Sequence, residues 1–586
     1  MSKPLWVLDS VPAGHAGVRI DPRWCVQTYR GSELPSRLSD YGPRQHSWEG
    51  LVDAMINDHP VPVTHDVSDT ARPLREYQRE QHDRIRTALN ARTPGYLLNW
   101  PVGSGKTPIS IAALSSSQPS LTILIITRQT LVGMWRSAIN QFAVRDGHRW
   151  VVINAERMWR LFTHPTKSMA SVPGHQRLEA AASFGVPHMI FDAVIVDECH
   201  MLGDPDSRRA RMVRRLESPF QVDLSATPFS TPLETEYLSD LLAYGAGVDP
   251  PNSLTDYRDW LRRIGFRLNV DEAKRWRHDI NSLDLRRITS LLYENGVGAA
   301  VDVDQLGLPR QERQLLPIEL SPEERVVYEK GWQAFRRELG VEGASAEPAA
   351  ARASALRNLQ KASLIKTPYL AEIIADFVER GYQVAVPAFF LDTVHALAKQ
   401  VAQALAKRGL PDQVVTMVGA DISGVHAAQA GREYDRRELK RQAFQAGVAK
   451  VAIFNAHEGV NLQAGEQNID GSRHDSGGGI HATTAPRVTV LADVLTGGKR
   501  ILQAEGRTHR DGQSATAFYA YAADTTEQEW LAKVFTATAN TRALSLSHGD
   551  AATLLDLARE LDTDRSNLPA HGPASSDQAK ALSRLA

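Results

Sequence analysis

Residues 97–114, LLNWPVGSGKTPISIAAL, have the composition of a phosphate-binding loop. A short apolar run leads into a glycine-rich turn, and a second apolar run typical of a helix follows. Glycines at such a turn let backbone N–H groups approach phosphate oxygens, and the N-terminus of the following helix favours negative charge. The residues predicted to hold phosphate and Mg²⁺ are Gly103, Ser104, Gly105, Lys106 and Thr107. The alternative is a turn that caps an ordinary helix, and Trp100 stands where the strict pattern has glycine.

Two adjacent carboxylates, Asp197 and Glu198, end the hydrophobic run AVIV about ninety residues after the loop. Doubly wound sheets place their ligand chemistry at strand ends. Mg²⁺ needs a hard oxygen ligand and hydrolysis needs a group that orients water, so we expect Asp197 to bind the metal and Glu198 to act as the base. The alternatives are an exposed acidic turn and a zinc pair from Cys199 and His200, whose ligand set nothing nearby completes.

Short β-branched runs separated by longer segments are expected to position these residues. The first set is YLLNW, LTILIIT, WVVINA, FDAVIVDE and FQVDLSAT. Such runs predict a parallel sheet covered by helices. Strand signals stop over about 232–360 and resume with YQVAVPAFF, QVVTMVG, KVAIFNA, RVTVLADV and AFYAYAA, which predict a second α/β domain. A polar, glycine-rich stretch at 464–486 interrupts the second set and is expected to be an exposed loop insertion.

The composition limits the possible partners. Lys and Arg number 67 and Asp and Glu 68, which gives a net charge of −1, so a nucleic acid must be held by a local basic groove. The stretches 208–215 and 432–441 are candidates for that groove, with solvated helix faces as the alternative. Two cysteines exclude a disulfide framework and favour a reducing, cytoplasmic location. Apolar runs of about 18 residues are absent, so no membrane partner is expected.

Further motifs resemble those of the superfamily 2 helicases. LREYQ (74–78) is similar to their upstream glutamine motif, DECH (197–200) to the second, SATP (225–228) to the third, NAHEGVNLQ (455–463) to the fifth and QAEGRTHRDGQ (503–513) to the sixth. These helicases commonly lack the first glycine of the loop. Residues 308–332 and the later GVNLQ and GRTHRDGQ strings resemble Swi/Snf-type translocases, and GRTHR is also similar to the strawberry notch family. The resemblance covers about 72–540; it departs at 464–486 and in DECH, which replaces DEGH or DEAH-like forms.

The resemblance implies an α/β fold of two RecA-like parallel-sheet lobes, with a helical insertion between them and a small N-terminal extension. The implied domains are an extension of unknown role (1–70), an ATP-binding lobe (71–240), a mainly helical interlobe region (241–360), a second lobe that contains the insertion (361–545) and a C-terminal tail (546–586). ATP and Mg²⁺ would be bound between the lobes, with nucleic acid lying across both.

The resemblance also assigns roles to residues. Gln78 would read adenine, and Arg507 and Arg510, spaced to share one helical face, would stabilise charge on the γ-phosphate. Coupling or nucleic-acid contacts are implied for Thr127, Arg128, Ser225, Thr227, Asn461, Gln463 and Gln503. The predicted function is a helicase or translocase driven by ATP along single- or double-stranded DNA. The alternatives are an RNA helicase, an ATP-switched binding module, and the motor subunit of a restriction or defence complex. Protein partners would then come from a replication, recombination or defence complex.

Overall fold

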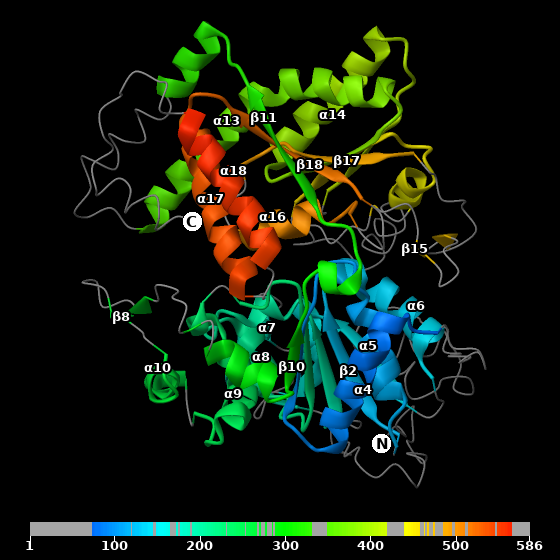
Figure 1. The fold of residues 1–586 in the computed structure, drawn as a ribbon, viewed down its shortest axis with the longest axis vertical. Coiled ribbons are helices and arrows are strands. Elements are labelled where there is room, and N and C mark those ends of the chain that lie inside the picture. Colours follow the sequence, from blue (N-terminus) through cyan, green and yellow to red (C-terminus); the bar gives the residue numbers. More distant parts are fainter. Residues whose placement is uncertain are drawn as a thin grey trace. The chain divides into compact units, whose positions relative to one another are not determined.

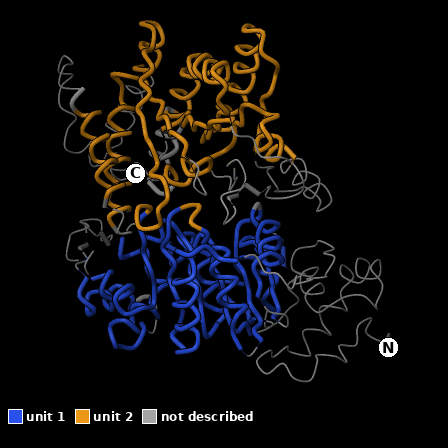
Figure 2. Tube along the Cα trace, turned by 45° about the vertical axis from the view of Figure 1, so that its right-hand side comes forward, with its two compact units in different colours: residues 1–101, 105–302, 544–546 blue, residues 102–104, 303–543, 547–586 orange. Residues whose placement is uncertain are grey.

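The computed structural model describes residues 73–118, 120–144, 148–163, 172–173, 176–187, 190–229, 231–251, 254–266, 269–270, 276–277, 284, 287–330, 348–418, 439–456, 462, 466–467, 473–474, 485–494, 498–509, 514–544 and 548–564. The chain forms two compact units (Figure 2). The first comprises residues 1–101, 105–302 and 544–546, and the second comprises residues 102–104, 303–543 and 547–586. The predicted extension 1–70 lies outside the described residues.

The first unit is built on a six-stranded sheet with the order β10-β1-β7-β6-β2-β3. Every pairing in it is parallel. Its strands are β1 (Gly95–Asn99), β2 (Thr122–Thr127), β3 (Arg149–Asn154), β6 (Ala193–Asp197), β7 (Gln221–Ser225) and β10 (Gly298–Ala300). The five runs predicted as strands are therefore confirmed. Their near-continuous apolar character reflects burial on both faces, since helices cover parallel sheets on each side.

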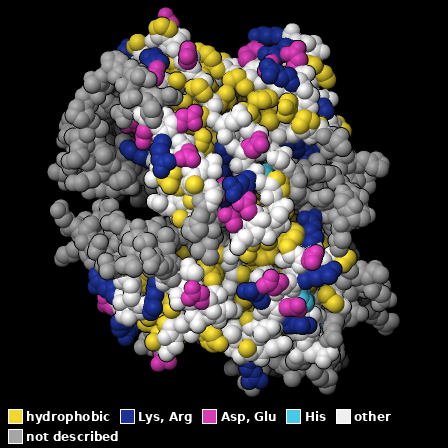
Figure 3. Space-filling view, in the orientation of Figure 1, with side chains coloured by type: hydrophobic (Ala, Val, Ile, Leu, Met, Phe, Trp, Pro, Cys, Tyr) yellow, Lys and Arg dark blue, Asp and Glu magenta, His cyan; other side chains and the backbone are white. Residues whose placement is uncertain are grey.

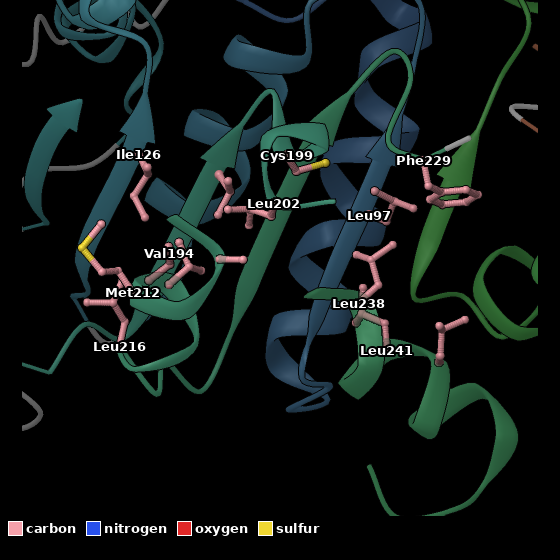
Figure 4. Close-up of a cluster of buried hydrophobic side chains, with 14 of the residues drawn as sticks. Leu97, Ile126, Val194, Cys199, Leu202, Met212, Leu216, Phe229, Leu238 and Leu241 are labelled. Carbon is pink, nitrogen blue, oxygen red and sulfur yellow. The ribbon is translucent and has the colours of Figure 1, made fainter. Parts of the chain in front are cut away.

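Two groups of helices cover this sheet (Figure 1). On one face lie α4 (Glu76–Asn90), α5 (Lys106–Ser115) and α6 (Val132–Phe142), and Tyr96 of β1 donates a hydrogen bond to Gln81 of α4 there. On the other lie α7 (Arg177–Phe184), α8 (Arg208–Arg214), α9 (Ser239–Ala246) and α10 (Leu254–Arg263). Their core includes Leu97, Val194, Met212 and Leu241 (Figure 4).

Short elements complete the first unit. Two antiparallel pairs are β4 (Phe162–Thr163) with β5 (Val186–Pro187), and β8 (Asn269–Val270) with β9 (Trp276–Arg277). The 3₁₀ turns are Gln129–Leu131, Ala155–Leu161, Cys199–Leu202, Pro232–Glu234 and Glu236–Leu238, and Thr289–Glu294 is a π-helical turn.

The second unit repeats the parallel design with the strand order β11-β18-β17-β12-β14-β13. Its strands are β11 (Glu312–Ile318), β12 (Gln383–Ala388), β13 (Val414–Met417), β14 (Val451–Asn455), β17 (Arg487–Leu491) and β18 (Thr516–Ala522). Within the predicted insertion 464–486, β15 (Glu466–Gln467) and β16 (Arg473–His474) form an antiparallel pair. A 3₁₀ turn spans Asp304–Leu306.

Helices pack on both faces of the second sheet (Figure 1). The long α13 (Pro348–Glu379) and α14 (Leu391–Lys407) share one core with Val384, Val386 and Val488. The helices α16 (Gly498–Glu505), α17 (Thr526–Leu544) and α18 (His548–Asp564) share another core with Leu491 and Tyr519. None of the helices within the described ranges is both long and apolar enough to cross a membrane.

The observed division differs from the predicted domain boundaries. The region 241–360, predicted as a mainly helical unit of its own, is shared: β10 joins the first sheet and β11 joins the second. The predicted tail 546–586 contains α18, whose Leu554 and Leu561 pack with Trp530 and Phe535. The sequence did not predict β10 because this strand is only three residues long. It did not predict β11 because this strand carries charged residues in place of an apolar run.

Candidate nucleotide site

The glycine-rich loop adopts the backbone that its sequence predicts. It connects the carboxyl end of β1 to the first residue of α5, and Gly103 and Gly105 have φ values of 78° and 87°. Gln78 packs against this loop, since a Cβ at Gly105 would lie 2.0 Å from its Nε2 atom. The Oε1 atom of Gln78 accepts a hydrogen bond of 3.0 Å from the Arg75 N–H. The positive φ therefore disfavours any other residue at position 105, and Gln78 would have to move to admit a side chain there.

Trp100 is compatible with the loop because its carbonyl, and not its side chain, faces the key lysine. The Nζ atom of Lys106 donates to the carbonyls of Trp100 at 2.8 Å and Pro101 at 2.9 Å. The indole of Trp100 is only 1 % exposed, and its ring lies 6.2 Å from that of Tyr77. The loop lysine is thus held by its own loop, and phosphate oxygens are the acceptors that could replace these carbonyls.

The carboxylate of Asp197 stands at the carboxyl end of β6 and is held by two neutral donors. Its Oδ2 atom accepts one hydrogen bond from the hydroxyl of Thr127 and one from the indole Nε1–H of Trp135, both 2.8 Å long. Burial and the neighbouring Glu198 raise the pKa of Asp197, and these two hydrogen bonds oppose that rise. Hard oxygens from Asp197 and Thr107 are the ligand type that Mg²⁺ prefers, so the donor set fits this ion.

Glu198 occupies a strained backbone position directly after β6. Its φ of 56° and ψ of 49° lie in the left-handed region, which non-glycine residues rarely adopt and which clusters at functional sites. Its Oε2 atom lies 3.2 Å from Nδ1 of His200. Burial acts to raise the pKa of Glu198, but the hydrogen bond and charge of His200, with the charges of Arg128 and Lys106, hold this pKa well below its usual range. The predicted base is therefore ionised.

His200 also connects Glu198 to the SATP motif at the end of β7. Its Nδ1 atom lies 3.3 Å from the hydroxyl of Ser225, and this hydroxyl accepts a 3.0 Å hydrogen bond from the backbone N–H of Thr227. A chain of polar contacts thus runs from the predicted base to the predicted coupling motif. His200, considered in the sequence only as a partner of Cys199 in a zinc site, is the central residue of this chain.

The zinc alternative receives no support from the geometry. The Sγ atom of Cys199 lies 3.5 Å from the hydroxyl of Tyr237, and Cys199 is part of the buried core (Figure 4). His200 instead contacts Glu198 and Ser225. Among the described residues, no group of three or more His, Cys, Asp or Glu side chains is placed to hold a metal.

Thr127 and Arg128, for which nucleic-acid contacts were implied, lie beside the acidic residues. The hydroxyl of Thr127 is fully buried and donates to Asp197, while the charge of Arg128 acts on Glu198. Trp135 was missed by the sequence reasoning. The available signal was its place on the helix that follows β2, the neighbour of β6 in the sheet.

In the second unit, Arg507 does not lie on a helix. The helix α16 ends at Glu505, and a turn containing Gly506 follows, so the predicted helical face shared by Arg507 and Arg510 is wrong for Arg507. The turn is fixed by a 2.7 Å hydrogen bond between the hydroxyls of Thr508 and Thr489 and by a 2.9 Å bond from the N–H of Leu462 to the carbonyl of Arg507. Gln503 is buried on α16. Arg510, Asn461 and Gln463 lie outside the described residues.

A buried ion network anchors the end of α16. Arg313 of β11 donates to both carboxylate oxygens of Glu505, at 2.6 and 2.8 Å, and also pairs with Asp550 of α18. Arg542 pairs with Asp550 at 2.7 Å, and the hydroxyl of Tyr519 donates to Glu505. Two arginines and two acids therefore balance one another two residues before Arg507.

The arginines of the candidate basic stretch 208–215 make ion pairs and hydrogen bonds within the first unit. Each of its arginines has an acidic or carbonyl partner. These pairs are Arg208 and Arg211 with Glu179, Arg209 with Glu156, Arg214 with Glu236, and Arg215 with the carbonyls of Ala182 and Ser183. On the face shown in Figure 3, basic and acidic side chains are likewise interspersed. Most of the other candidate stretch, 432–441, lies outside the described residues.

Comparison with known proteins gives one family match. Residues 72–230 match the sequence model of the family described as "Type III restriction enzyme, res subunit". No curated protein sequence matches the chain. No comparison tests the resemblance to the strawberry notch family, which stays a prediction.

Two solved structures from Sulfolobus solfataricus are similar to the chain. One is a SWI2/SNF2 ATPase core in complex with dsDNA, 14% identical, which covers 85% of this chain and 97% of that chain with a TM-score of 0.30. The other is a SWI2/SNF2 ATPase core domain, also 14% identical, which covers 80% of this chain and 90% of that chain with a TM-score of 0.30.

The family match covers the glycine-rich loop, the DECH strand end and the SATP motif, which the structure gathers at the carboxyl edge of the first sheet. The second parallel sheet supplies the other lobe. Residues 72–230 are accordingly similar to this family, and the two parallel six-stranded sheets are consistent with two RecA-like lobes.

Proposed function

We propose that the chain is an ATP-driven motor that moves along DNA as a translocase or helicase. The observation that carries this proposal is the gathering of Lys106, Asp197 and Glu198 at the carboxyl edge of one sheet, with Glu198 linked through His200 to the SATP motif. A nucleotide-binding module without turnover needs the lysine but has no use for an ionised base. A base connected to a coupling motif is what turnover and movement require.

Each residue of the site has its own role in this proposal. The Nζ atom of Lys106 exchanges the carbonyls of Trp100 and Pro101 for phosphate oxygens. Glu198, kept ionised beside His200, orients the attacking water. Mg·ATP, when bound, supplies a γ-phosphoryl group whose transfer to water drives the cycle. Arg507 and Arg510 are assigned by their motif to stabilise charge in the transition state.

Two features favour DNA over RNA. Residues 308–332 and the GVNLQ and GRTHRDGQ strings resemble the Swi/Snf-type translocases. In addition, the family that matches residues 72–230 is described as a restriction enzyme subunit, and restriction enzymes act on DNA. Backbone contacts that position a motor without reading bases are the expected mode of binding.

The test compares ATPase rates of the purified chain with single-stranded DNA, duplex DNA and RNA. Strand-displacement and triplex-displacement assays on the same preparation separate the two kinds of motor. Triplex displacement without unwinding identifies a translocase, and strand displacement identifies a helicase. Stimulation by RNA alone would contradict the proposal.

The family match favours a second candidate, the motor subunit of a restriction complex. Such a subunit would be stimulated only by duplexes that carry a recognition site, or only when a partner subunit is present. A free-standing motor responds to any duplex of sufficient length. ATPase rates on a panel of unrelated duplexes, measured with the chain alone, distinguish the two candidates.

A further inference from the structure

We infer that Trp135 and Thr127 are positioning residues for the carboxylate of Asp197. Together they fix its Oδ2 atom, so that its Oδ1 atom is presented to the divalent cation that accompanies ATP. The inference deepens the proposed function and rests on it, because it concerns the cation of the same site.

The contact is built from three different elements. Thr127 is the last residue of β2, Asp197 is the last residue of β6, and Trp135 lies in the first turn of α6. The side chains of Thr127 and Trp135 are fully buried, and that of Asp197 is nearly so. Both donors lie 2.8 Å from the same oxygen, which is within the normal range for hydrogen bonds.

Two donors on one oxygen determine the rotation of the whole carboxylate. The terminal torsion of an aspartate is otherwise broad, so an isolated carboxylate would sample many orientations. With Oδ2 occupied by Thr127 and Trp135, the lone pairs of Oδ1 are the ones left for a cation or its water. The indole N–H is a donor only, and it cannot itself ligate a metal.

The choice of neutral donors is what makes the arrangement suitable for a cation. An arginine or lysine on Oδ2 would orient the carboxylate equally well but would cancel its charge. Trp135 and Thr127 orient Asp197 without bringing a positive charge to its Oδ2 atom. The alternative is that Asp197 merely satisfies a buried indole, as buried tryptophans generally require a partner.

Trp260 provides a matched control for that alternative. It is also buried in the first unit, and its Nε1–H donates a 2.9 Å hydrogen bond to the carbonyl of Asp249. Trp135→Phe and Trp260→Phe therefore each remove one indole donor from a buried site. Thr127→Val removes the second donor to Asp197 with little change in shape, and Thr127→Ser retains the hydroxyl.

The experiment measures binding of a fluorescent, non-hydrolysable ATP analogue to the full chain as Mg²⁺ is titrated, and separately in EDTA. Loss of a residue that orients a metal ligand typically weakens metal affinity 10- to 100-fold. We expect the Mg²⁺ midpoint to rise about 10-fold in Trp135→Phe and in Thr127→Val, with affinity in EDTA unchanged. Thr127→Ser restores the wild-type midpoint, and Trp260→Phe leaves it unchanged.

The outcomes distinguish failure of the positioning role from failure of the proposed function. If wild-type chain binds the analogue but Trp135→Phe matches Trp260→Phe in its Mg²⁺ midpoint, the positioning role is overturned and the ATPase proposal stands. If Trp135→Phe fails to fold, the Thr127→Val and Thr127→Ser pair decides by the same midpoint. If the wild-type chain binds no analogue at any Mg²⁺ concentration, both the proposed function and this inference fall.

Discussion

The two units treat their buried acids in opposite ways. In the first, Asp197 receives only neutral donors, from Thr127 and Trp135. In the second, Glu505 receives a two-point ion pair from Arg313, whose side chain is completely buried. Both acids lie beside residues predicted to act on ATP. One is held by neutral donors, and the other is paired with a buried cation.

This difference indicates that buried acids have two roles here, binding a cation and holding a loop in place. An acid that must attract a cation cannot be paired permanently, so the first unit fixes its geometry with hydroxyl and indole donors. An acid that must hold a loop in place benefits from pairing, because a buried ion pair loses much stability when one partner is removed. Glu505 lies two residues before Arg507, and the pairing therefore fixes the turn that carries this arginine.

The largest expected effect is in the first unit, at Glu198, the neighbour of Asp197. Glu198→Gln retains the size of the side chain but removes the ionised base beside His200, so we expect ATP hydrolysis to fall by about 10²- to 10⁴-fold. Steady-state ATPase with saturating duplex DNA measures it, and Glu217→Gln, at an exposed position, is the control. Retention of nucleic-acid-stimulated hydrolysis in Glu198→Gln would remove Glu198 from the mechanism.

In the second unit, we expect removal of the buried cation Arg313 to cause a large loss of stability. Arg313→Met leaves Glu505 and Asp550 without their shared cation in a buried site, and we expect the free energy of unfolding to fall by about 3–5 kcal/mol. Urea unfolding followed by tryptophan fluorescence measures this change. Arg559→Met, which removes an exposed pair with Asp556, is expected to cost less than about 1 kcal/mol. Equal losses in the two variants would mean that the buried network does not stabilise the second unit.

Asp223 extends the comparison to pH. This residue of β7 is buried, its carboxylate accepts hydrogen bonds from Gln221 at 3.0 and 3.1 Å, and burial raises its pKa to about 8. In the unfolded chain Asp223 has the ordinary pKa of an aspartate, about 4, and loses its proton above that pH. The folded protein keeps this proton up to about pH 8. Stability from this group is complete below about pH 4 and is lost as the pH rises towards 8.

The slope of that loss can be measured. One proton held only by the folded state lowers the free energy of unfolding by about 1.4 kcal/mol per pH unit between these values. Asp223→Asn removes the proton and should flatten the dependence between pH 5 and 7. Tyr237, the titratable neighbour, stays neutral there because burial raises its pKa well above the ordinary value. An unchanged slope in Asp223→Asn would show that Asp223 is ionised in the folded protein.

The sequence predicted the parts of this site that depend on local patterns. Strand β1, the loop before Lys106 and the strand ending in Asp197 each carry their signal within a few residues, as an apolar run or a glycine-rich turn. Trp135 gave no such signal, since its donor role depends on β2 lying beside β6 in the sheet. Nor did Arg313, which meets Glu505 across 192 residues of sequence.

The smallest expected effect concerns the basic stretch 208–215, which the sequence suggested as part of a nucleic-acid groove. Arg208 and Arg211 of α8 share Glu179 as their partner, so one of their two positive charges is offset inside the first unit. The double variant Arg208→Gln, Arg211→Gln should therefore cost less than about 1 kcal/mol of stability. Duplex DNA affinity, measured by fluorescence anisotropy at several salt concentrations, should keep its slope, whereas two lost phosphate contacts would reduce the slope by about two. A reduced slope would show that α8 gives up Glu179 to bind DNA, and would place an exchangeable ion pair between the permanently paired Glu505 and the unpaired Asp197.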